Sequence, residues 1–380
     1  MKIRMELAER VRRYIAIEDA RERPLIVYAT STRLGVGSRI AGDAVRELID
    51  QIDAIPPEQD KVDVLIHSTG GDALAAWKLM SILRERFNKV SVLVPYMAFS
   101  AATLFCLGAN EIFMHPHASL GPIDPQITVP QGDGQQRAFS FEDVGAFLRF
   151  LKEEIGLSEQ LHTTPIIEKL LSVVDAVHVG GAKRASELST DVGERLLRMH
   201  MASDEQGRAR EIAENLNKSF FAHGDAVSRT RARDLQLKVA ENNPELEKLI
   251  WEAYLGIESH MKFRSPFVPL EHFLDKAGDE ALAPAAPLVL PPNAPEQVVQ
   301  QLWNQIATQA VQKLADPPIE VPYVIVPAII ESRRRASEFR TSGVMTALRM
   351  IGGEIRLNMT QKSSCWVPVI DDDDDHGTEV

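Results

Sequence analysis

The stretch IHSTGGD (66–72), followed by VPYMAFSAATLFCLGANEIFMHPHASLGPIDPQ (94–126), is the most informative part of the sequence about the fold. In each part an apolar strand ends in a turn of glycine or small residues and then continues into a helix. Strands are expected at 24–30, 62–68, 90–95 and 111–116, with helices between them. Repeated strand–helix–strand units of this length predict right-handed crossovers and a parallel sheet, so the expected fold class is α/β.

Beyond about residue 140 the spacing of apolar residues becomes helical. A composition break follows at 281–296, where proline and alanine dominate and predict a semi-rigid linker. We therefore expect a domain at 1–280 and a C-terminal extension at 297–380, with one amphipathic helix and an acidic tail. Few contacts should cross such a linker, so truncation near residue 280 is expected to leave a folded core.

The composition is that of an ordinary globular protein, with 44% hydrophobic and 25% charged residues. The net charge of −12 argues against a nucleic-acid partner, which would need clustered lysine and arginine. Cys106 and Cys365 lie far apart, as expected in a reducing compartment. We find no signal peptide and no apolar stretch of about 18 residues. The expectation is a cytoplasmic protein without a membrane span.

Ser100 stands at the start of a small, apolar run that must be buried. One interpretation is a helix N-cap, in which its hydroxyl accepts a backbone N–H from the first turn. The other is a nucleophile at a strand-to-helix turn. In a parallel sheet, this turn and the preceding Gly70–Gly71 turn lie at the carboxyl ends of neighbouring strands, where open α/β sheets place their sites.

The Gly70–Gly71 turn and Ala101 offer backbone N–H groups that could converge on an oxyanion beside Ser100 Oγ. Each such donor stabilises a transition state by roughly 3–4 kcal/mol. A pair of glycines before a helix is common in isolation. The combination with a serine at the next strand end, and with the loop LGPIDP (120–125) after the following strand, is more specific.

On these stretches the chain resembles the Clp protease/crotonase superfamily, and within it the serine dehydrogenase proteinase family, relatives of signal peptide peptidase A. The resemblance extends over roughly residues 24–260 and is dense at 62–130. It implies a Clp/crotonase-like core with helical additions, Ser100 as nucleophile, and an oxyanion hole from Gly71 and Ala101. Relatives commonly carry glycine after the serine, where this chain has alanine.

The general base is not fixed by the resemblance. Signal peptide peptidase-like enzymes pair serine with lysine, yet no lysine lies between Ser100 and Lys152. Clp-type enzymes use histidine and aspartate, yet their histidine position falls near Ile123–Asp124. Neither pattern transfers directly to this chain.

Four residues of the sequence are candidates for the base. His223 lies two residues before Asp225, and a carboxylate can hold a histidine in the tautomer that a serine nucleophile needs. Lys183 follows a glycine pair at an expected helix start, where burial could lower a lysine pKa. His115 and His117 are weaker candidates. Asp124 is expected to stabilise a turn or contact a neighbouring copy, and the residues expected to be structural are His67, Asp72 and Cys106.

The function expected from the sequence is that of a serine endopeptidase which forms an acyl-enzyme on Ser100 and needs no cofactor or metal. Its partners would be a peptide or protein substrate and further copies of the same chain, because one sheet cannot cover so many apolar helical faces. Two alternatives stay open. One is a catalytically silent oligomeric scaffold of the same fold, and the other is a crotonase-like enzyme that polarises a thioester.

Overall fold

A seven-stranded sheet forms the centre of the computed structural model, in the order β12-β11-β10-β1-β2-β3-β5. The described residues are 2–130, 136–157, 159–218, 225–278, 295–301, 304, 319–349 and 355–369. Within these ranges, none of the helices has both the length and the apolar character needed to cross a membrane.

The strands of the central sheet are β1 (Leu25–Thr30), β2 (Lys61–His67), β3 (Lys89–Val94), β5 (Glu111–Met114), β10 (Val321–Glu331), β11 (Ala336–Arg349) and β12 (Ile355–Pro368). A small sheet contains β4 (Met97–Ala98), β6 (Ser119–Leu120) and β9 (Val227–Ser228), and a hairpin pairs β7 (Gln126–Pro130) with β8 (Gln136–Ser140). The α-helices are α1 (Lys2–Arg21), α2 (Ala44–Asp53), α3 (Ala73–Arg86), α4 (Ala101–Leu107), α5 (Phe141–Arg149), α6 (Gln160–Val173), α7 (Ala176–Arg198), α8 (Ala209–Lys218), α9 (Arg229–Asp234), α10 (Pro244–Met261) and α11 (Pro269–Ala277).

Strands β1, β2, β3 and β5 pair in parallel, which confirms the predicted α/β core. Every residue of β1 is buried, and so are all residues of β2 and β3 after the first. Near-continuous apolar runs are typical of strands that helices cover on both faces. The sequence therefore placed the four parallel strands correctly, within one or two residues at their ends.

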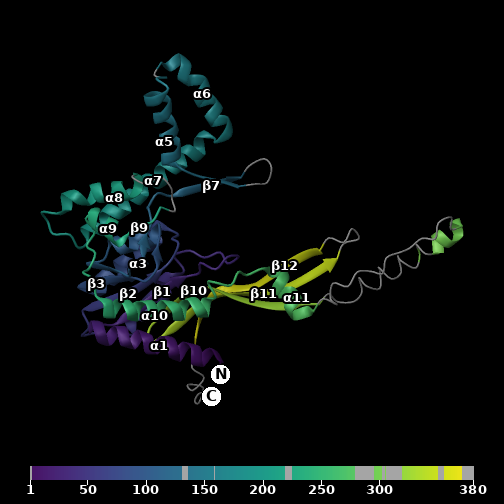
Figure 1. Cartoon of the computed structure of the whole chain (residues 1–380), viewed down its shortest axis with the longest axis horizontal. Helices are drawn as coiled ribbons and strands as arrows, with labels where there is room; N and C mark the ends of the chain where they lie inside the picture. The colour runs from purple at the N-terminus through teal and green to yellow at the C-terminus, as the bar shows by residue number, and fades with distance from the viewer. Residues whose placement is uncertain are drawn as a thin grey trace, which may run out of the picture.

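Helices pack on both faces of this sheet, as Figure 1 shows for α3 on one side and α1 with α10 on the other. Helices α2, α3, α4 and α7 contribute to the larger apolar cluster, and α1 and α10 to the second. All seven residues of α4 are buried. Gly193 of α7 allows this close packing, because a Cβ there would lie 3.4 Å from Leu104 and 3.3 Å from Ile123.

The C-terminal extension contributes β10, β11 and β12 to the central sheet, an arrangement that differs from the separable extension expected from the linker. Strand β10 pairs antiparallel with β1, from Val27↔Glu331 to Thr30↔Ala328. The run PYVIVPAII (322–330) carries the β-branched composition of a strand, but its partner lies about 300 residues away in sequence, and composition does not reveal partners. Most of the Pro/Ala-rich linker, and most of the helix expected after it, lie outside the described residues.

A buried ionic cluster joins this extension to the N-terminal helix; we call its members Arg10, Tyr14, His260, Glu331 and Glu338 the junction cluster. Arg10 donates to both carboxylate oxygens of Glu331, at 3.0 and 2.6 Å, and Tyr14 donates a third bond at 2.8 Å. His260 of α10 bonds Glu338 of β11 at 2.8 Å. Arg10 Nη1 is buried without a hydrogen-bond partner among the described residues, but the other contacts of the cluster join the extension to the core in addition to strand pairing.

Candidate active site

Two turns at the carboxyl edge of the sheet lie directly against each other. Ser68 follows β2, and its N–H donates to the carbonyl of Met97 at 3.1 Å. The N–H of Phe99 donates back to the carbonyl of Ser68 at 3.0 Å. The Gly70–Gly71 turn and the segment that delivers Ser100 are thus fixed to one another through backbone hydrogen bonds, as the parallel-sheet argument requires.

Ser100 has a backbone conformation that a serine seldom adopts, with φ 52° and ψ −117°. It directly precedes α4, but its side chain makes no capping hydrogen bond, and the first N–H groups of the helix gain nothing from its hydroxyl. The N-cap interpretation therefore fails. Such a conformation costs on the order of 1–3 kcal/mol and persists only when the surroundings impose it, which happens most often at functional sites.

The glycine turn packs against this strained residue. A Cβ added to Gly70, whose φ is +115°, would lie 2.7 Å from Ser100 Cβ and 3.3 Å from Ala101 N. A Cβ on Gly71, whose φ is +150°, would lie 2.2 Å from the carbonyl oxygen of Ile40. Both positions therefore require glycine, on steric and on conformational grounds.

The backbone N–H groups of Gly71 and Ala101, the two expected oxyanion donors, differ from the N–H of Gly70 in their hydrogen bonding. The N–H of Gly70 is engaged, because it donates to Ser68 Oγ at 3.0 Å. Among the hydrogen bonds of the described residues, none uses the N–H of Gly71 or of Ala101. Backbone donors at a turn and at a helix start remain available for a ligand only when they are unpaired in this way.

A third segment, the loop that begins at Gly121, is tied to the same place by a threonine that the sequence reading missed. Thr103 Oγ1 lies 2.7 Å from the carbonyl oxygen of Ala98 and 2.8 Å from that of Gly121. It also accepts from the N–H of Gly121 at 3.0 Å. A Cβ on Gly121 would lie 2.9 Å from the ring of Phe99, so this position too excludes larger residues.

Of the two expected bases, the structure describes only Lys183, which makes no hydrogen bond to Ser100. His223 lies outside the described residues. Lys183 lies in α7 with an exposed side chain, and its Nζ is 3.8 Å from Glu187. Ser100 Oγ makes no hydrogen bond to any residue in the described ranges, so the geometry leaves the choice of base open.

The other histidines near the sheet edge belong to an aromatic group packed on α10. The ring of His115 stacks on Trp251 at a centroid distance of 4.9 Å, and His117 contacts both rings. Burial and the neighbouring His117 lower the pKa of His115. His67 is fully buried against Tyr254, and burial lowers its pKa to about 3. These side chains pack with α10, on the face of the sheet opposite α4.

Asp72, Cys106 and Asp124 are the remaining residues that the sequence analysis singled out. Asp72 caps α3 by accepting from the N–H of Leu74 at 2.8 Å. Cys106 is completely buried in α4, and burial raises the pKa of its thiol. Asp124 is intermediate in exposure and interacts with its surroundings.

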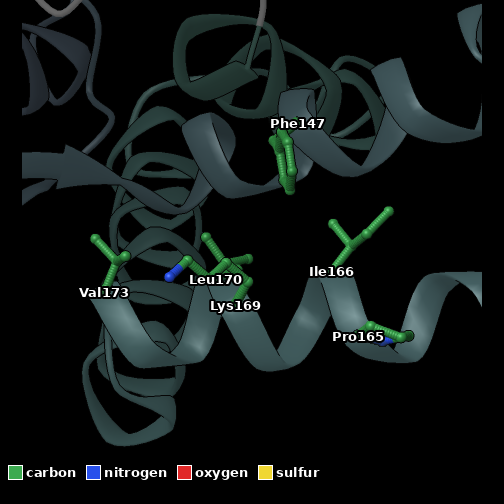
Figure 2. A pocket seen from close by; sticks show the side chains of 6 residues that line it. All are labelled: Phe147, Pro165, Ile166, Lys169, Leu170 and Val173. Carbon is green, nitrogen blue, oxygen red and sulfur yellow. The ribbon is translucent and has the colours of Figure 1, made fainter.

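A cavity of about 400 Å³ lies elsewhere, between α5 and α6 (Figure 2). Its apolar lining includes Phe147 of α5 and Leu170 of α6, with Lys169 beside them. In Figure 1 these two helices stand away from the central sheet. None of the residues that line this cavity belongs to the turns around Ser100, so it forms no part of the candidate site.

In the described part of the chain, only His260, Glu331 and Glu338 group like metal ligands, with donor atoms within 4.8 Å of one another. Arg10, however, occupies both oxygens of Glu331, and Arg340 donates to Glu338 at 2.8 Å. A guanidinium at hydrogen-bond distance would repel a metal cation. The group is therefore an ion-pair network.

Comparison with protein families matches residues 40–134 to the ClpP-like SDH-type serine proteinases. This segment contains both turns and Ser100. It is also the part in which the sequence alone showed the densest resemblance, and that resemblance is confirmed.

Two curated relatives come from Methanocaldococcus jannaschii. Uncharacterized protein MJ1495 is 30% identical over 200 residues, which cover 53% of this chain and 59% of the relative. Uncharacterized protein MJ0137 is 26% identical over 219 residues, which cover 55% of this chain and 63% of the relative. The chain thus spans about three fifths of the length of these relatives.

Two solved structures of one protease are also similar. The first is a serine-to-alanine mutant of 1510-N, a membrane-bound stomatin-specific protease, with 16% identity and a TM-score of 0.36, covering 60% of this chain and 84% of that one. The second is a lysine-to-alanine mutant in complex with a substrate peptide, also with 16% identity, a TM-score of 0.34, and coverage of 59% and 78%.

Proposed function

We propose that this chain, whose residues 40–134 match the ClpP-like SDH-type serine proteinases, is a serine endopeptidase that forms an acyl-enzyme on Ser100. The observation that carries the proposal is the strained backbone of Ser100 beside the N–H groups of Gly71 and Ala101, neither of which has a partner among the described residues. A serine that served only as a helix cap would need neither feature.

The chemistry follows from this arrangement. A base takes the proton from Ser100 Oγ as the oxygen attacks the substrate carbonyl carbon, and the resulting oxyanion accepts from Gly71 N–H and Ala101 N–H. When the C–N bond breaks, the base returns the proton to the leaving amine, and the acyl group stays on Ser100. Water then attacks the ester in the same way, which releases the carboxylic acid and restores the serine.

His223 and Lys183 remain the two proposed bases. A histidine would need a carboxylate to hold its tautomer, and Asp225 is close in sequence. A lysine acts as a base only when it is deprotonated, which requires burial or a neighbouring cation. In this structure Lys183 is exposed beside Glu187, so its use would require a change of surroundings, such as contact with a second copy of the chain.

A fluorophosphonate probe tests the nucleophile directly. Labelling should occur on Ser100 of the wild-type protein and disappear in Ser100→Ala. Ser119→Ala is a suitable control, because Ser119 is a second partly buried serine, on β6. A silent scaffold or a thioester enzyme without a nucleophile predicts no labelling of Ser100, and that result would refute the peptidase proposal.

The base is assigned by pH profiles of peptide hydrolysis. A histidine base predicts that kcat/KM rises with pH through a pKa near about 6.5, and that His223→Ala abolishes the rise. A lysine base predicts that Lys183→Ala is inactive while His223→Ala keeps full activity. Full activity in both single variants would exclude both residues.

We also propose that the chain forms a homo-oligomer whose interfaces use the helices of residues 141–220. Supporting this, large apolar side chains in the segment from α5 to α7 are exposed, among them Phe147, Ile155 and Val177. Sedimentation at micromolar concentration should give a mass above the 42.2 kDa of one chain. A single species at the monomer mass would contradict the proposal.

A further inference from the structure

The hydroxyl of Ser68 has a complete set of hydrogen bonds at the base of the glycine turn. It accepts from the N–H of Gly70 at 3.0 Å and from Thr30 Oγ1 at 2.7 Å. It lies 3.3 Å from the carbonyl oxygen of Gly70, to which it donates. Ser68 is 1% exposed, so no water competes for these bonds.

These bonds decide which N–H of the turn is free. Because Ser68 Oγ accepts from the N–H of Gly70, that donor points back into the turn and is not available to a ligand. The carbonyl of Gly70 is held from the other side, since it accepts from the N–H of Ile40 at 2.8 Å. With the peptide groups on both sides of Gly70 fixed, the next N–H, that of Gly71, is left in one orientation.

Thr30 connects this turn to a neighbouring strand. It is the last residue of β1, it is completely buried, and its hydroxyl reaches Ser68 across the parallel pair formed by β1 and β2. Because Ser68 Oγ accepts from Thr30 Oγ1 in addition to its two bonds with Gly70, Thr30 limits the rotation of the Ser68 side chain. The position of the glycine turn is thereby fixed relative to β1 of the central sheet, and not only by bonds within the turn itself.

We propose that Ser68, held by Thr30, is a positioning residue that sets the Gly71 N–H of the oxyanion hole. This inference rests on the proposed peptidase function. Neither hydroxyl touches the substrate. Loss of either one should weaken transition-state binding and leave substrate binding unchanged, because the oxyanion exists only in the transition state and the tetrahedral intermediate.

Ser68→Ala is the first test. It should lower kcat about tenfold or more with KM within about threefold of wild type, less than the 10²–10³ lost when an oxyanion donor is removed outright. Affinity for a peptide aldehyde, which forms a tetrahedral adduct, should fall by the same factor as kcat/KM.

Ser91→Ala is the matched control. Ser91 is a buried serine of the same sheet, near the amino end of β3, where its hydroxyl accepts from Arg23 at 3.1 Å and donates to Glu111 at 3.3 Å. Its loss should lower thermal stability and leave kcat unchanged. Equal losses of kcat in Ser68→Ala and Ser91→Ala would reduce the role of Ser68 to stability and overturn the proposal.

A pair of substitutions at Thr30 keeps the proposal testable if Ser68→Ala does not fold. Thr30→Val keeps the shape and removes the hydroxyl, whereas Thr30→Ser keeps the hydroxyl. We expect kcat to fall several-fold in the valine variant and to stay near wild type in the serine variant. The reverse order would refute the proposal that the Thr30 hydroxyl holds Ser68 in place. Failure of the peptidase proposal itself would look different, since wild type and Ser100→Ala would then hydrolyse peptide equally.

Discussion

Two buried polar clusters in this protein show opposite designs. Around Ser100 the polar groups are hydroxyls and backbone amides, the serine backbone is strained, and two N–H groups have no partner in the part of the chain that the structure describes. In the junction cluster two buried carboxylates are surrounded by donors, and each of the carboxylates of Glu331 and Glu338 accepts at least two hydrogen bonds. Unused donors suit a site that must bind something, whereas paired charges suit a contact that must hold.

The largest expected effect concerns the junction. Truncation after residue 278 removes β10–β12, leaves β1 as an unprotected edge and deprives buried Arg10 of its partner. Exposed strand edges promote aggregation, and an uncompensated buried charge is strongly destabilising. The truncated chain should be unfolded or insoluble by circular dichroism and size-exclusion chromatography. A soluble, cooperatively melting product would show that the extension is separable after all.

Ser100→Ala should have the next largest effect. It should change activity and leave stability nearly unchanged, in contrast to changes in the junction cluster. Peptide hydrolysis should fall a thousandfold or more, because no other group can form the acyl intermediate. Stability should stay within about 0.5 kcal/mol of wild type, since the side chain makes no hydrogen bond to the described residues. Activity assays and thermal melts on the same preparation test both statements. Retained hydrolysis would remove Ser100 from the mechanism.

Glu331→Gln should have the opposite effect to Ser100→Ala: it should lower the stability of the protein more than its peptidase activity. Both Glu331 and Arg10 are almost fully buried, so removing one charge should cost about 3–5 kcal/mol in the free energy of unfolding. The control is Asp50→Asn, which breaks the surface pair with Arg46 and should cost at most about 1 kcal/mol. Urea denaturation compares the two variants, and equal costs would show that the burial of the junction cluster is unimportant.

The smallest effect is a dependence of stability on acid pH. Burial raises the pKa of Glu338, but hydrogen bonds and the charges of His260 and Arg340 outweigh burial and lower the pKa to about 2. Arg10, Glu6 and Glu331 complete the charged surroundings. An unfolded glutamate titrates near about 4.3, so this contribution is complete above that pH and is lost as the pH falls towards 2.

Glu338→Gln provides the matched measurement for that prediction. The difference in unfolding free energy between wild type and variant should be largest near pH 6 and should shrink between about pH 5 and pH 2. A difference that stays constant over this range would show that Glu338 is not the titrating group.

Much of the site was predictable because its elements are close in sequence. Gly70, Gly71, Ser100 and Ala101 lie within 32 residues, at the ends of two consecutive parallel strands. Strand order in such a unit follows from chain order and crossover handedness, so the juxtaposition of these turns could be inferred. Thr103 and Ser68 were missed, although a hydroxyl two residues before a glycine pair is a visible signal.

The parallel α/β core, the glycine turn and the position of Ser100 could be predicted from the sequence, because local periodicity and turn chemistry specify them. The strained, uncapped state of Ser100, the bond from the Gly70 N–H to Ser68 and the place of β10 beside β1 emerge only from the folded molecule. Each of these depends on contacts between segments far apart in the chain or on backbone angles set by packing. Patterns of residue type along a single chain carry no information on either.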